Sequence, residues 1–332
     1  MKADVPTISV VTATKNSIRT IRASLSSIRE QEYPQDKIEI IVADGGSTDG
    51  TLDVARMYKA RIYRIDPKKQ NAEYNKSIGV ANASNEIIAM IYHDNILPHR
   101  RWMKNIVRPF MEQPDVVGVE TLRYHYEPKG ELLDRYFALF GCGDPIVWYL
   151  GKSDRLSYMF EMEKKPYSIV TFTEKNMPTI GANGFLVRRG ILTTYAQTKP
   201  GRYFDMDVNI DLIRNGFDTF AFVHDGIIHK TGYGNIWSYF ARRMLFMGEY
   251  RVGRTNRRFQ MVSKANIWRL IWAVVASISI VIPLYDGVRG WRKIHDRAWF
   301  LHPLMALGFV LVYSWVIMKH YLSSYAHHIV AK

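Results

Sequence analysis

Two aspartates follow strand-like segments in the N-terminal part of the sequence, where their side chains could serve nucleotide binding. Asp44 ends the apolar run Ile38–Ala43 and precedes the small residues of the stretch GGSTDG. A carboxylate at a strand end accepts hydrogen bonds from a pyrimidine ring N–H or from ribose hydroxyls, and glycines let a ligand approach the backbone closely. The alternative is a simple strand-to-helix turn, in which the same residues only shape the chain.

The second aspartate, Asp94, lies in the stretch YHDN directly after the apolar segment Glu86–Tyr92. Its carboxylate is a hard oxygen ligand suited to Mg²⁺ or Mn²⁺. Two exposed carboxylates at neighbouring strand ends are costly unless cations or ligands meet them. A cation held at Asp94 would bridge a diphosphate and neutralise the charge that develops on a leaving group.

A later stretch, RYFDMDVNIDLIRNG, offers carboxylates for acid–base chemistry at Asp205, Asp207 and Asp211. A displacement by a hydroxyl needs a base that takes the hydroxyl's proton. The alternative for Asp205 and Asp207 is capping of the helix that follows. Asp211 lies one turn later, and we expect it to be an ordinary helix residue.

The elements that must position these residues alternate between strand and helix patterns. Strands are predicted at residues 7–13, 38–43, 60–65 and 86–92, and helices at 17–30, 51–58 and 71–83. The alternation predicts an α/β fold with right-handed crossovers and a mostly parallel sheet, whose ligands bind beyond the carboxyl ends of the strands. The aromatic-rich segment Tyr136–Phe160 has three alternative interpretations: an acceptor-facing loop, a segment at the lipid interface or a core hairpin.

Two apolar segments near the end of the sequence predict membrane attachment. Ile267–Tyr285 and Ala298–Met318 each match the roughly 20 residues that cross a bilayer, and tryptophans and tyrosines flank them. We expect a two-helix hairpin with both of its ends on the cytosolic side. Because the linker carries Arg289, Arg292 and Lys293, the alternative is that both helices lie in the interface or dip in and return.

The composition narrows the class of partner. The 332 residues carry a net charge of +14, which suits nucleic acid, anionic lipid or a phosphate-bearing substrate. The single cysteine, Cys142, excludes an internal disulfide and a cysteine-based metal cluster. A basic stretch precedes the apolar segments, so an anionic membrane is favoured over nucleic acid, with a merely solvated basic face as the alternative. Its residues are Arg242, Arg243, Arg251, Arg254, Arg257, Arg258 and Lys264, against Glu249.

Four motifs in order resemble the inverting family-2 glycosyltransferases of the GT-A fold. They are VVTATKN, VADGGSTDGT, NKSIGVANASNEIIAMIYHDN and FDMDVNIDLIRNG with IIH after it, and they cover about residues 7–235. The resemblance implies an α/β GT-A domain, a nucleotide-sugar donor and a divalent cation, Mg²⁺ or Mn²⁺. It also implies that Thr12, Ala13, Thr14 and Asp44 form the nucleoside pocket.

The same resemblance assigns the cation and diphosphate contacts. The family's Asp-x-Asp metal motif falls on Tyr92, His93 and Asp94, so Tyr92 replaces the first aspartate. Asp94 keeps the metal-ligand position, Asn95 assists it, and His93 lies with the donor. His229 is implied as a ligand of the metal or diphosphate, with a structural histidine as the alternative.

Basic residues and the base complete the implied site. Lys76 is implied as a diphosphate contact, as are Arg242 and Arg243, whose alternative partners are lipid phosphates. The family's Glu-Asp pair aligns with Met206 and Asp207, which makes Asp207 the predicted base and Asp205 the runner-up. Asn183 in GANG is a predicted acceptor contact.

Our hypothesis is therefore a metal-dependent inverting glycosyltransferase of the cell membrane, with its catalytic domain on the cytoplasmic side. It passes a sugar, most simply from a UDP-sugar, to a hydroxyl of a lipid-linked saccharide. The alternatives are a polyprenyl-phosphate sugar synthase and an inactive membrane-anchored nucleotide-sugar-binding protein; a nucleotidyltransferase lacks support because TATKNS has no glycine. Self-association stays open.

The hypothesis also divides the chain. We expect a glycosyltransferase domain over residues 1–235, with a nucleotide-binding half at about 1–115 and an acceptor half at about 116–235. Basic juxtamembrane helices at 236–266, two membrane helices at 267–322 and a tail at 323–332 are expected to follow.

Overall fold

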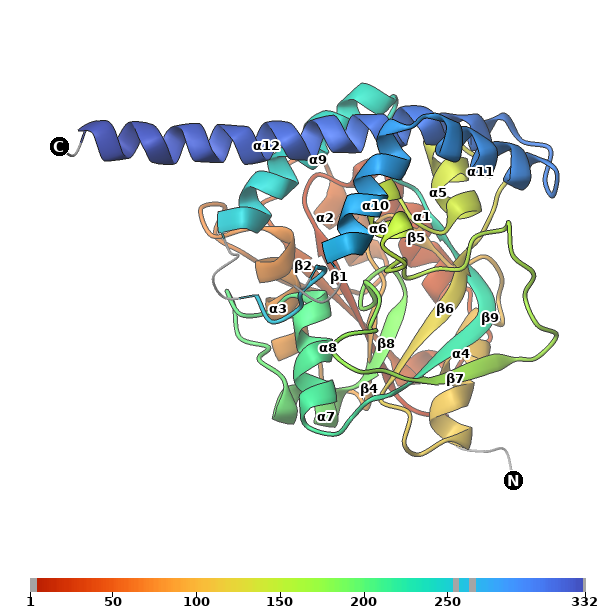
Figure 1. The fold of residues 1–332 in the computed structure, drawn as a ribbon. Coiled ribbons are helices and arrows are strands. Elements are labelled where there is room, and N and C mark those ends of the chain that lie inside the picture. The colour runs from red at the N-terminus through yellow and green to blue at the C-terminus, as the bar shows by residue number, and fades with distance from the viewer. Residues whose placement is uncertain (1–4, 253–256, 263–266, 331–332) are drawn as a thin grey trace. The chain divides into compact units, whose positions relative to one another are not determined.

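The computed structural model describes residues 5–252, 257–262 and 267–330, and the chain forms two compact units. The first, here called the sheet unit, comprises the residues up to Glu127 with Asp154–Leu156 and Glu161–Gly232 (Figure 1). The second, the helical unit, comprises Pro128–Ser153, Ser157–Phe160 and the residues from Tyr233 onwards. The predicted domain boundary near residue 235 lies close to Gly232. Residues 128–153, however, which we expected in the glycosyltransferase domain, pack with the C-terminal helices.

The sheet unit contains one sheet in which the described strands follow the order β3-β2-β1-β4-β8-β6-β9-β5, with β7 also paired to β9. The strands are β1 Ile8–Thr14, β2 Ile38–Asp44, β3 Arg61–Arg64, β4 Ile87–Met90, β5 Asn95–Ile96, β6 Gly118–Tyr124, β7 Tyr167–Thr171, β8 Phe185–Arg188 and β9 Thr219–His229. The parallel part is confirmed for β1 to β4. β8 runs antiparallel to β4 and β6, so the whole sheet is mixed. The sequence did not indicate this, because hydropathy patterns do not report strand direction.

Buried apolar residues explain the central strands and the helices that cover them. β1 and β2 are buried along almost their whole length, as strands covered on both faces must be. On α1 the buried residues Ile21, Leu25 and Ile28 recur at helical spacing. The helices of this unit are α1 Ile18–Arg29, α2 Thr51–Met57, α3 Ala72–Ala81, α4 Trp102–Glu112, α7 Arg189–Tyr195 and α8 Asp205–Arg214.

Helix α3 lies very close to strand β1, and this contact fixes the position of Lys76. The Asn71 side chain accepts a hydrogen bond from the Tyr74 N–H, 2.9 Å away, and so caps the helix. Gly79 allows the close approach, because a Cβ there would lie 2.4 Å from Cγ1 of Val11.

Strand register brings several predicted site residues to neighbouring positions. Thr14 on β1 pairs with Asp44 on β2, at the carboxyl ends of both strands. In another strand pair, Asn95 on β5 pairs with His229 on β9. The Lys230 N–H also donates to the carbonyl of Asp94 over 2.8 Å, so the loop that carries Asp94 is tied to the end of β9.

The helical unit contains the apolar segments, and one of them differs from the prediction. Its described helices are α5 Leu132–Phe140, α6 Pro145–Tyr149, α9 Ile236–Val252, α10 Ile267–Ile278, α11 Val281–Trp291 and α12 His302–Val330. Ile267–Tyr285 is not one helix: α10 and α11 meet at 78°. At the break Ile280 has φ +58°, a conformation costly for a β-branched residue, and Pro283 follows in the first turn of α11.

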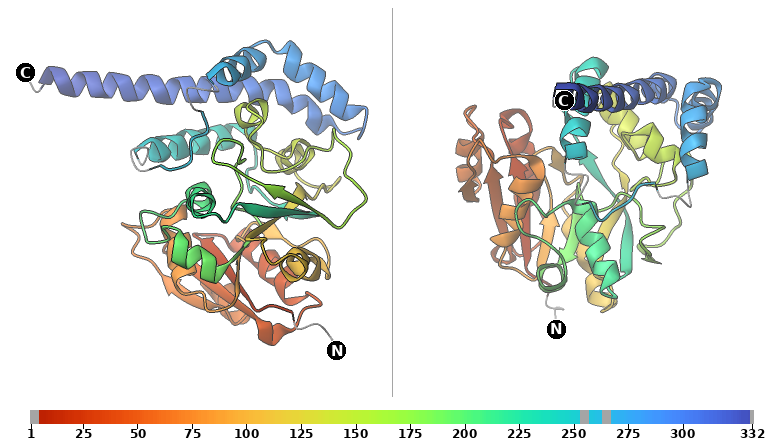
Figure 2. Two further views of the ribbon diagram at one scale, coloured as in Figure 1. Left: turned by 60° about the horizontal axis from the view of Figure 1, so that its bottom comes forward. Right: turned by 60° about the vertical axis from the view of Figure 1, so that its left-hand side comes forward.

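Most of the second apolar segment lies in the single long helix α12, which follows the short 3-10 helix Arg297–Leu301 (Figure 2). Among the described residues, Arg297–Leu322 is the one helical stretch that is long and apolar enough to cross a bilayer by itself. The bent pair α10–α11 passes the same test only when it is counted as one span. A two-helix hairpin is therefore not established. Helix α12 continues through the expected C-terminal tail as far as Val330.

The expected basic juxtamembrane region is only partly covered. Residues 236–252 of this region form helix α9. Arg254 and Lys264, which belong to the predicted basic stretch, lie outside the described residues.

Candidate active site

One cluster in the sheet unit joins a lysine, two carboxylates and a tyrosine. The Lys76 ammonium lies 3.0 Å from Oε2 of Glu73 and donates a short hydrogen bond to Oδ2 of Asp205. Its side chain is only 6% exposed. Burial lowers the pKa of Lys76, but the charges of Asp205 and Glu73 outweigh burial, so its pKa lies above the ordinary value. The cluster therefore holds a permanent positive charge beside Asp205.

Tyr92, which the resemblance aligns with the first aspartate of the metal motif, belongs to this cluster. Its hydroxyl donates a long hydrogen bond of 3.5 Å to Oδ1 of Asp205, and the Lys76 ammonium lies 5.3 Å from its ring centroid. Burial and the charge of Asp205 raise its pKa well above the ordinary value, so the hydroxyl stays a donor. In the sequence Tyr92 is only the absence of an aspartate, whereas in the structure its phenol gives this position a different polar group.

Asp94, two residues after Tyr92, forms a second pair with His229. Oδ2 of Asp94 lies 3.4 Å from Nε2 of His229. Burial raises the pKa of Asp94, but the charge and hydrogen bond of His229 lower it further, and the net pKa falls below the ordinary value. The other oxygen, Oδ1, is buried without a hydrogen-bond partner. A buried carboxylate oxygen without a partner is costly, and a cation would satisfy it.

Asp94 and His229 fit a Mg²⁺ or Mn²⁺ ion whose other ligands are substrate phosphates and water. Within the described part of the chain, no group of three or more His, Cys, Asp or Glu side chains could enclose a metal. Mg²⁺ is commonly held by one or two protein ligands plus substrate phosphates and water, and Asp94 with His229 supplies that number.

Asn95, predicted to assist Asp94 as a metal ligand, has its side chain engaged by other groups in this structure. The residue is buried. Its amide oxygen accepts from the Tyr92 N–H over 2.9 Å, and its amide nitrogen donates to Oδ1 of Asn183 over 3.2 Å. Both ends of the amide therefore hold the loop around Asp94 in place.

The predicted nucleoside residues lie together, but their side chains are largely engaged. Thr12 donates to the Ile91 carbonyl over 2.6 Å and is fully buried, so its side chain is no ligand contact. The Thr14 hydroxyl donates to Oγ of Ser17 over 2.7 Å, whereas Ala13 is half-buried. Backbone contacts from Thr12 and Thr14 stay a prediction.

Asp44 is engaged in the same way. It is buried, and its carboxylate accepts from the backbone N–H groups of Gly46 and Ser47, each at 3.0 Å. The structure thus favours the turn interpretation for this aspartate, and its nucleoside role stays a prediction.

His93 follows Tyr92 in the same loop. Its Nδ1 shares a hydrogen bond of 3.0 Å with the Thr20 hydroxyl of α1, which ties the loop to that helix. Its predicted contact with the donor stays a prediction.

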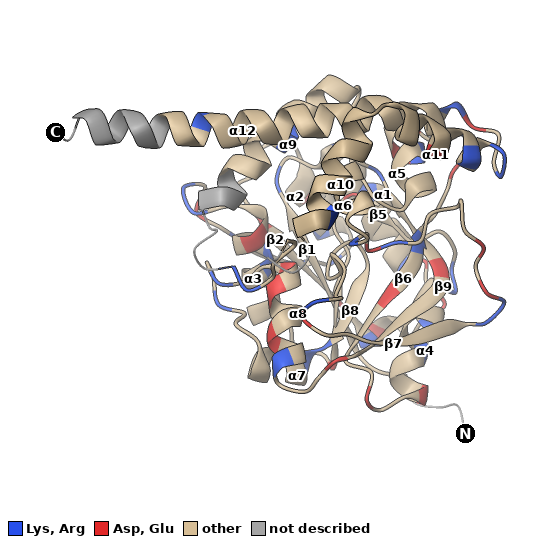
Figure 3. Ribbon diagram, in the orientation of Figure 1, with Lys and Arg blue, Asp and Glu red and all other residues tan. Residues whose placement is uncertain are grey.

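The structure distinguishes the two candidate bases at the start of α8, the helix whose acidic residues Figure 3 shows. Asp205 meets Lys76 and Tyr92, whereas Asp207 is fully buried at 0% exposure. Neither side chain caps the helix, because Phe204 occupies the N-cap position, so that alternative is wrong. Both aspartates lie in the first turn, where the helix dipole favours negative charge. Asp211 accepts from the Gln197 N–H over 2.9 Å and is a structural helix residue, as expected.

The two arginines of α9 belong to the helical unit. Nη2 of Arg243 donates to Oδ2 of Asp144 over 3.1 Å, and the Tyr313 hydroxyl donates to the same oxygen. Arg243 is thus engaged by a structural ion pair that the sequence did not indicate. Arg242 is exposed, and its role at a diphosphate or a lipid phosphate stays a prediction.

A buried ion-pair network behind the site was also missed. Nη1 of Arg155 lies 2.7 Å from Glu120 and 3.4 Å from Asp154, and the Arg155 side chain is fully buried. Burial raises the pKa of Glu120 to about 8, because Arg155 offsets only part of the burial cost and Asp154 adds a second negative charge. No local pattern could reveal this network, since Glu120 lies 34 and 35 positions before Asp154 and Arg155 in the sequence.

Glu120 predicts a pH dependence of stability. The folded chain keeps a proton on Glu120 up to about pH 8, whereas the unfolded chain releases it near the ordinary pKa of 4.5. The folded state thus binds more protons between these values, and the free energy of unfolding should fall as pH rises through that window. Glu120→Gln should remove this fall and make the chain more stable than wild type above pH 8, measured by thermal unfolding from pH 5 to 9. An unchanged slope in the variant would contradict the assignment.

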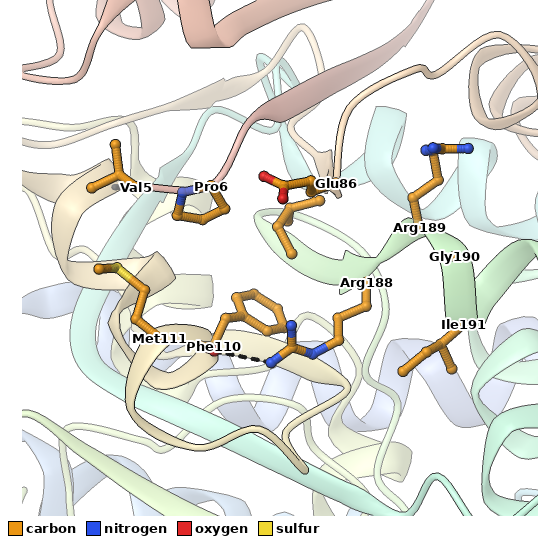
Figure 4. Close-up of a pocket in the computed structure, with 10 residues that line it drawn as sticks. Val5, Pro6, Glu86, Phe110, Met111, Arg188, Arg189, Gly190 and Ile191 are labelled. Carbon is orange, nitrogen blue, oxygen red and sulfur yellow. Dashed lines mark hydrogen bonds between the residues drawn. The ribbon is translucent and has the colours of Figure 1, made fainter. Parts of the chain in front are cut away.

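A cavity of about 510 Å³ lies elsewhere on the sheet unit and contains none of the predicted site residues (Figure 4). It is lined by residues that include Glu86, Phe110, Arg188 and Arg189. Glu86 accepts from the Thr7 N–H, and Arg188 donates to the carbonyls of Phe110 and Val116. These charged groups serve the packing at the amino ends of β1 and β4.

A comparison with protein families identifies the family of this chain. Residues 9–190 match the model described as glycosyl transferase family 2. The chain belongs to this family. The match covers Asp44, Lys76 and Asp94 but ends before Asp205 and His229, so the place of those two residues in this family 2 glycosyltransferase comes from the structure.

Relatives of known name are similar to part of this glycosyltransferase. The glycosyltransferase AglE of Haloferax volcanii is 28% identical over 141 residues, which is 41% of this chain and 46% of AglE. The dolichyl N-acetyl-alpha-D-glucosaminyl phosphate 3-beta-D-2,3-diacetamido-2,3-dideoxy-beta-D-glucuronosyltransferase of Methanococcus voltae is 29% identical over 123 residues, 34% of this chain and 37% of that enzyme. The matches span less than half of either relative.

A solved structure confirms the fold. The mannosyltransferase PcManGT of Pyrobaculum calidifontis, determined in complex with GDP-Man and Mn²⁺, superposes with a TM-score of 0.55 at 15% identity. The superposition covers 96% of this chain and 88% of PcManGT. The family 2 glycosyltransferase described here therefore has the GT-A fold, as predicted.

Proposed function

We propose that this glycosyltransferase transfers a sugar, with inversion, from a nucleoside-diphosphate sugar to a hydroxyl of a lipid-linked saccharide. The observation that carries the proposal is the junction of two clusters through the stretch Tyr92–Asp94. Tyr92 contacts Asp205 and Lys76, and Asp94 contacts His229. Groups suited to a base, a diphosphate and a cation thus lie beside one another at one edge of the sheet.

Asp94 and His229 would hold Mg²⁺ or Mn²⁺, which supplies charge neutralisation to the diphosphate when bound. PcManGT was determined with Mn²⁺, which supports this choice of cation. Tyr92 lies between the cation ligands and the base, where a metal-motif aspartate would add negative charge. Its neutral hydroxyl leaves that position with a hydrogen-bond donor.

Asp205 takes the acceptor hydroxyl's proton as the hydroxyl oxygen forms its bond to the anomeric carbon. The bond from that carbon to the diphosphate breaks, and the electron pair leaves with the diphosphate oxygen. Lys76 orients the Asp205 carboxylate and places a positive charge beside it. We prefer Asp205 to Asp207 because a fully buried carboxylate cannot reach an acceptor.

The helical unit supports a lipid-linked acceptor at the cytoplasmic face of the cell membrane. On α10, Trp268 and Trp272 are 76% and 52% exposed, which is typical of residues at a bilayer interface. The 78° break makes α10–α11 either a broken span or a re-entrant element, and α12 is the candidate helix that crosses by itself. The name of the Methanococcus voltae relative includes a dolichyl-linked acceptor, which agrees with this class.

Membranes that contain the chain test the proposal. We expect them to transfer radiolabel from one of a panel of UDP-, GDP- and dTDP-sugars into the lipid extract. Chelation with EDTA should abolish the transfer, and Mn²⁺ or Mg²⁺ should restore it. Membranes with Lys104→Met, a surface lysine that lies 3.3 Å from Glu32, serve as the matched control and should retain activity.

The form of the product separates the alternatives. A saccharide extended by one sugar on its lipid supports the proposal, whereas a single sugar on a polyprenyl monophosphate supports the synthase alternative. The proposed function would be contradicted if the chain shows no turnover and no nucleotide binding with any of these donors.

A further inference from the structure

The rings of His229 and Tyr124 lie against each other, and this contact has no place in the chemistry described so far. Their centroids are 5.5 Å apart, with 29° between the ring planes. Tyr124 ends β6, and His229 ends the parallel neighbour β9. The tyrosine thus stacks on the imidazole whose Nε2 lies 3.4 Å from Oδ2 of Asp94.

A register shift between β6 and β9 creates this contact. Thr121 pairs with Val223, but Arg123 pairs with Gly226, so β9 carries one extra residue. Without the shift, Tyr124 would pair with Gly226 and point to the sheet face opposite His229. With it, Tyr124 pairs with Ile227, and because side chains alternate along a strand, His229 shares the face of Ile227. A bulge of this kind commonly re-aims a side chain near a functional site.

The Tyr124 hydroxyl is itself held in place by two side chains. It donates to Oδ2 of Asp154 and accepts from Nδ2 of Asn183, each over 3.2 Å. Asn183 has φ +50°, a left-handed conformation, between Gly181 at +124° and Gly184 at +91°. A non-glycine residue in this conformation costs energy, so the stretch GANG spends strain to aim the Asn183 amide at this point.

These contacts connect five residues into a closed ring. Oδ1 of Asn183 accepts from Asn95, which adjoins Asp94. Asp94 meets His229, and His229 stacks on Tyr124. The order is Asp94, Asn95, Asn183, Tyr124 and His229, with the Asp94–Asn95 step made by the backbone.

A buried anchor fixes the ring from behind. Nη2 of Arg155 donates to the Asn183 carbonyl over 2.9 Å, and its guanidinium lies 5.1 Å from the Tyr124 ring centroid. Arg155 follows Asp154, and the Leu156 N–H donates to the Leu122 carbonyl over 2.7 Å, which adds this segment to the end of β6. Glu120 completes the anchor at 2.7 Å from Arg155.

We propose that Tyr124 and Asn183 are positioning residues that fix the orientation of Asp94 and His229 before the cation and diphosphate bind. The proposal rests on the proposed function, in which that pair holds the cation. Hydrogen-bonded groups behind metal ligands set the ligands' orientation, and losing one commonly lowers metal affinity about 10- to 100-fold. Asn183, predicted as an acceptor contact, has a different role here, because both ends of its amide are engaged.

The test measures Mn²⁺ affinity by electron paramagnetic resonance on the full chain in detergent. UDP or GDP, whichever the wild-type chain binds more tightly, is present throughout. Tyr124→Phe keeps the stacked ring and removes both hydroxyl contacts. Asn183→Gly keeps the backbone conformation and removes the amide. We expect each variant to weaken Mn²⁺ binding about 10-fold with an unchanged melting temperature.

Tyr167→Phe is the matched control, because it removes a tyrosine hydroxyl that donates to Glu112 at the surface over 2.6 Å. It should leave Mn²⁺ affinity unchanged. In an Asp94→Asn background, Tyr124→Phe should cause no further loss, which a purely structural role would not predict. The comparison stays valid if a variant also loses stability. A loss of Mn²⁺ affinity that disappears in the Asp94→Asn background must act through Asp94.

The outcomes separate this inference from the function beneath it. Wild-type Mn²⁺ affinity in both Tyr124→Phe and Asn183→Gly, with a loss in Asp94→Asn, would overturn the positioning role alone. An unchanged affinity in Asp94→Asn would overturn the proposed cation site, and with it the inference.

Discussion

Asp205→Asn is expected to lower kcat for sugar transfer by about 10²- to 10⁴-fold, the usual contribution of a general base. The amide keeps the shape of the side chain but cannot take a proton from the acceptor hydroxyl. Binding of the nucleotide sugar should change little, because the carboxylate acts on the acceptor. Single-turnover transfer and donor binding by calorimetry, compared with wild type, measure the two effects separately.

Asp207→Asn is the matched control, since it makes the same change two residues later on α8. Asp207 is fully buried, so its substitution should lower the melting temperature more than kcat per folded molecule. The reverse pattern, with Asp207→Asn inactive and Asp205→Asn active, would restore the base predicted from the sequence.

Lys76→Met is expected to destabilise the sheet unit by about 3 kcal/mol, the low end for losing one partner of a buried ion pair. The side chain is 6% exposed and neutralises both Asp205 and Glu73. Methionine keeps the apolar stem but leaves two carboxylates together without a cation. Denaturant unfolding of the full chain in detergent, followed by tryptophan fluorescence, measures the change.

A double substitution checks the cause of this loss. Lys76→Met with Asp205→Asn removes one of the two uncompensated charges and should recover part of the stability. Lys104→Met, at an exposed ion pair, should cost less than about 1 kcal/mol. Equal costs at Lys76 and Lys104 would show that the buried cluster does not depend on its cation.

Strands β1, β2 and β4 were predictable because each is a short buried run followed by a polar loop, whereas β3 is partly exposed and was placed by the strand–helix alternation. The same regularity located Asp44 and Asp94, since the ends of parallel strands meet at one edge, whereas Lys76 came from the family resemblance. The direction of β8 was not predictable, because a buried strand has the same hydropathy in either direction. The break at Ile280 was also hidden, as a window of apolar residues does not register a backbone turn.

The polar details of the site depended on distant contacts. Asn95 has the chemistry of a ligand, yet its amide bonds to the Tyr92 backbone and to Asn183, 88 positions away in the sequence. Tyr124 meets His229 only because of one extra residue in β9. Asp205 and Asp207 have the same residue type and lie on the same helix, and only burial tells them apart.

A crystal structure of the chain with Mn²⁺ and UDP or GDP, located by the anomalous scattering of manganese, tests the central claim most directly. We expect one manganese peak about 2.1 Å from an oxygen of Asp94, with His229 or a diphosphate oxygen as a further ligand. A manganese peak at another site, or a nucleotide bound away from Asp94, Tyr92 and Asp205, would contradict the account.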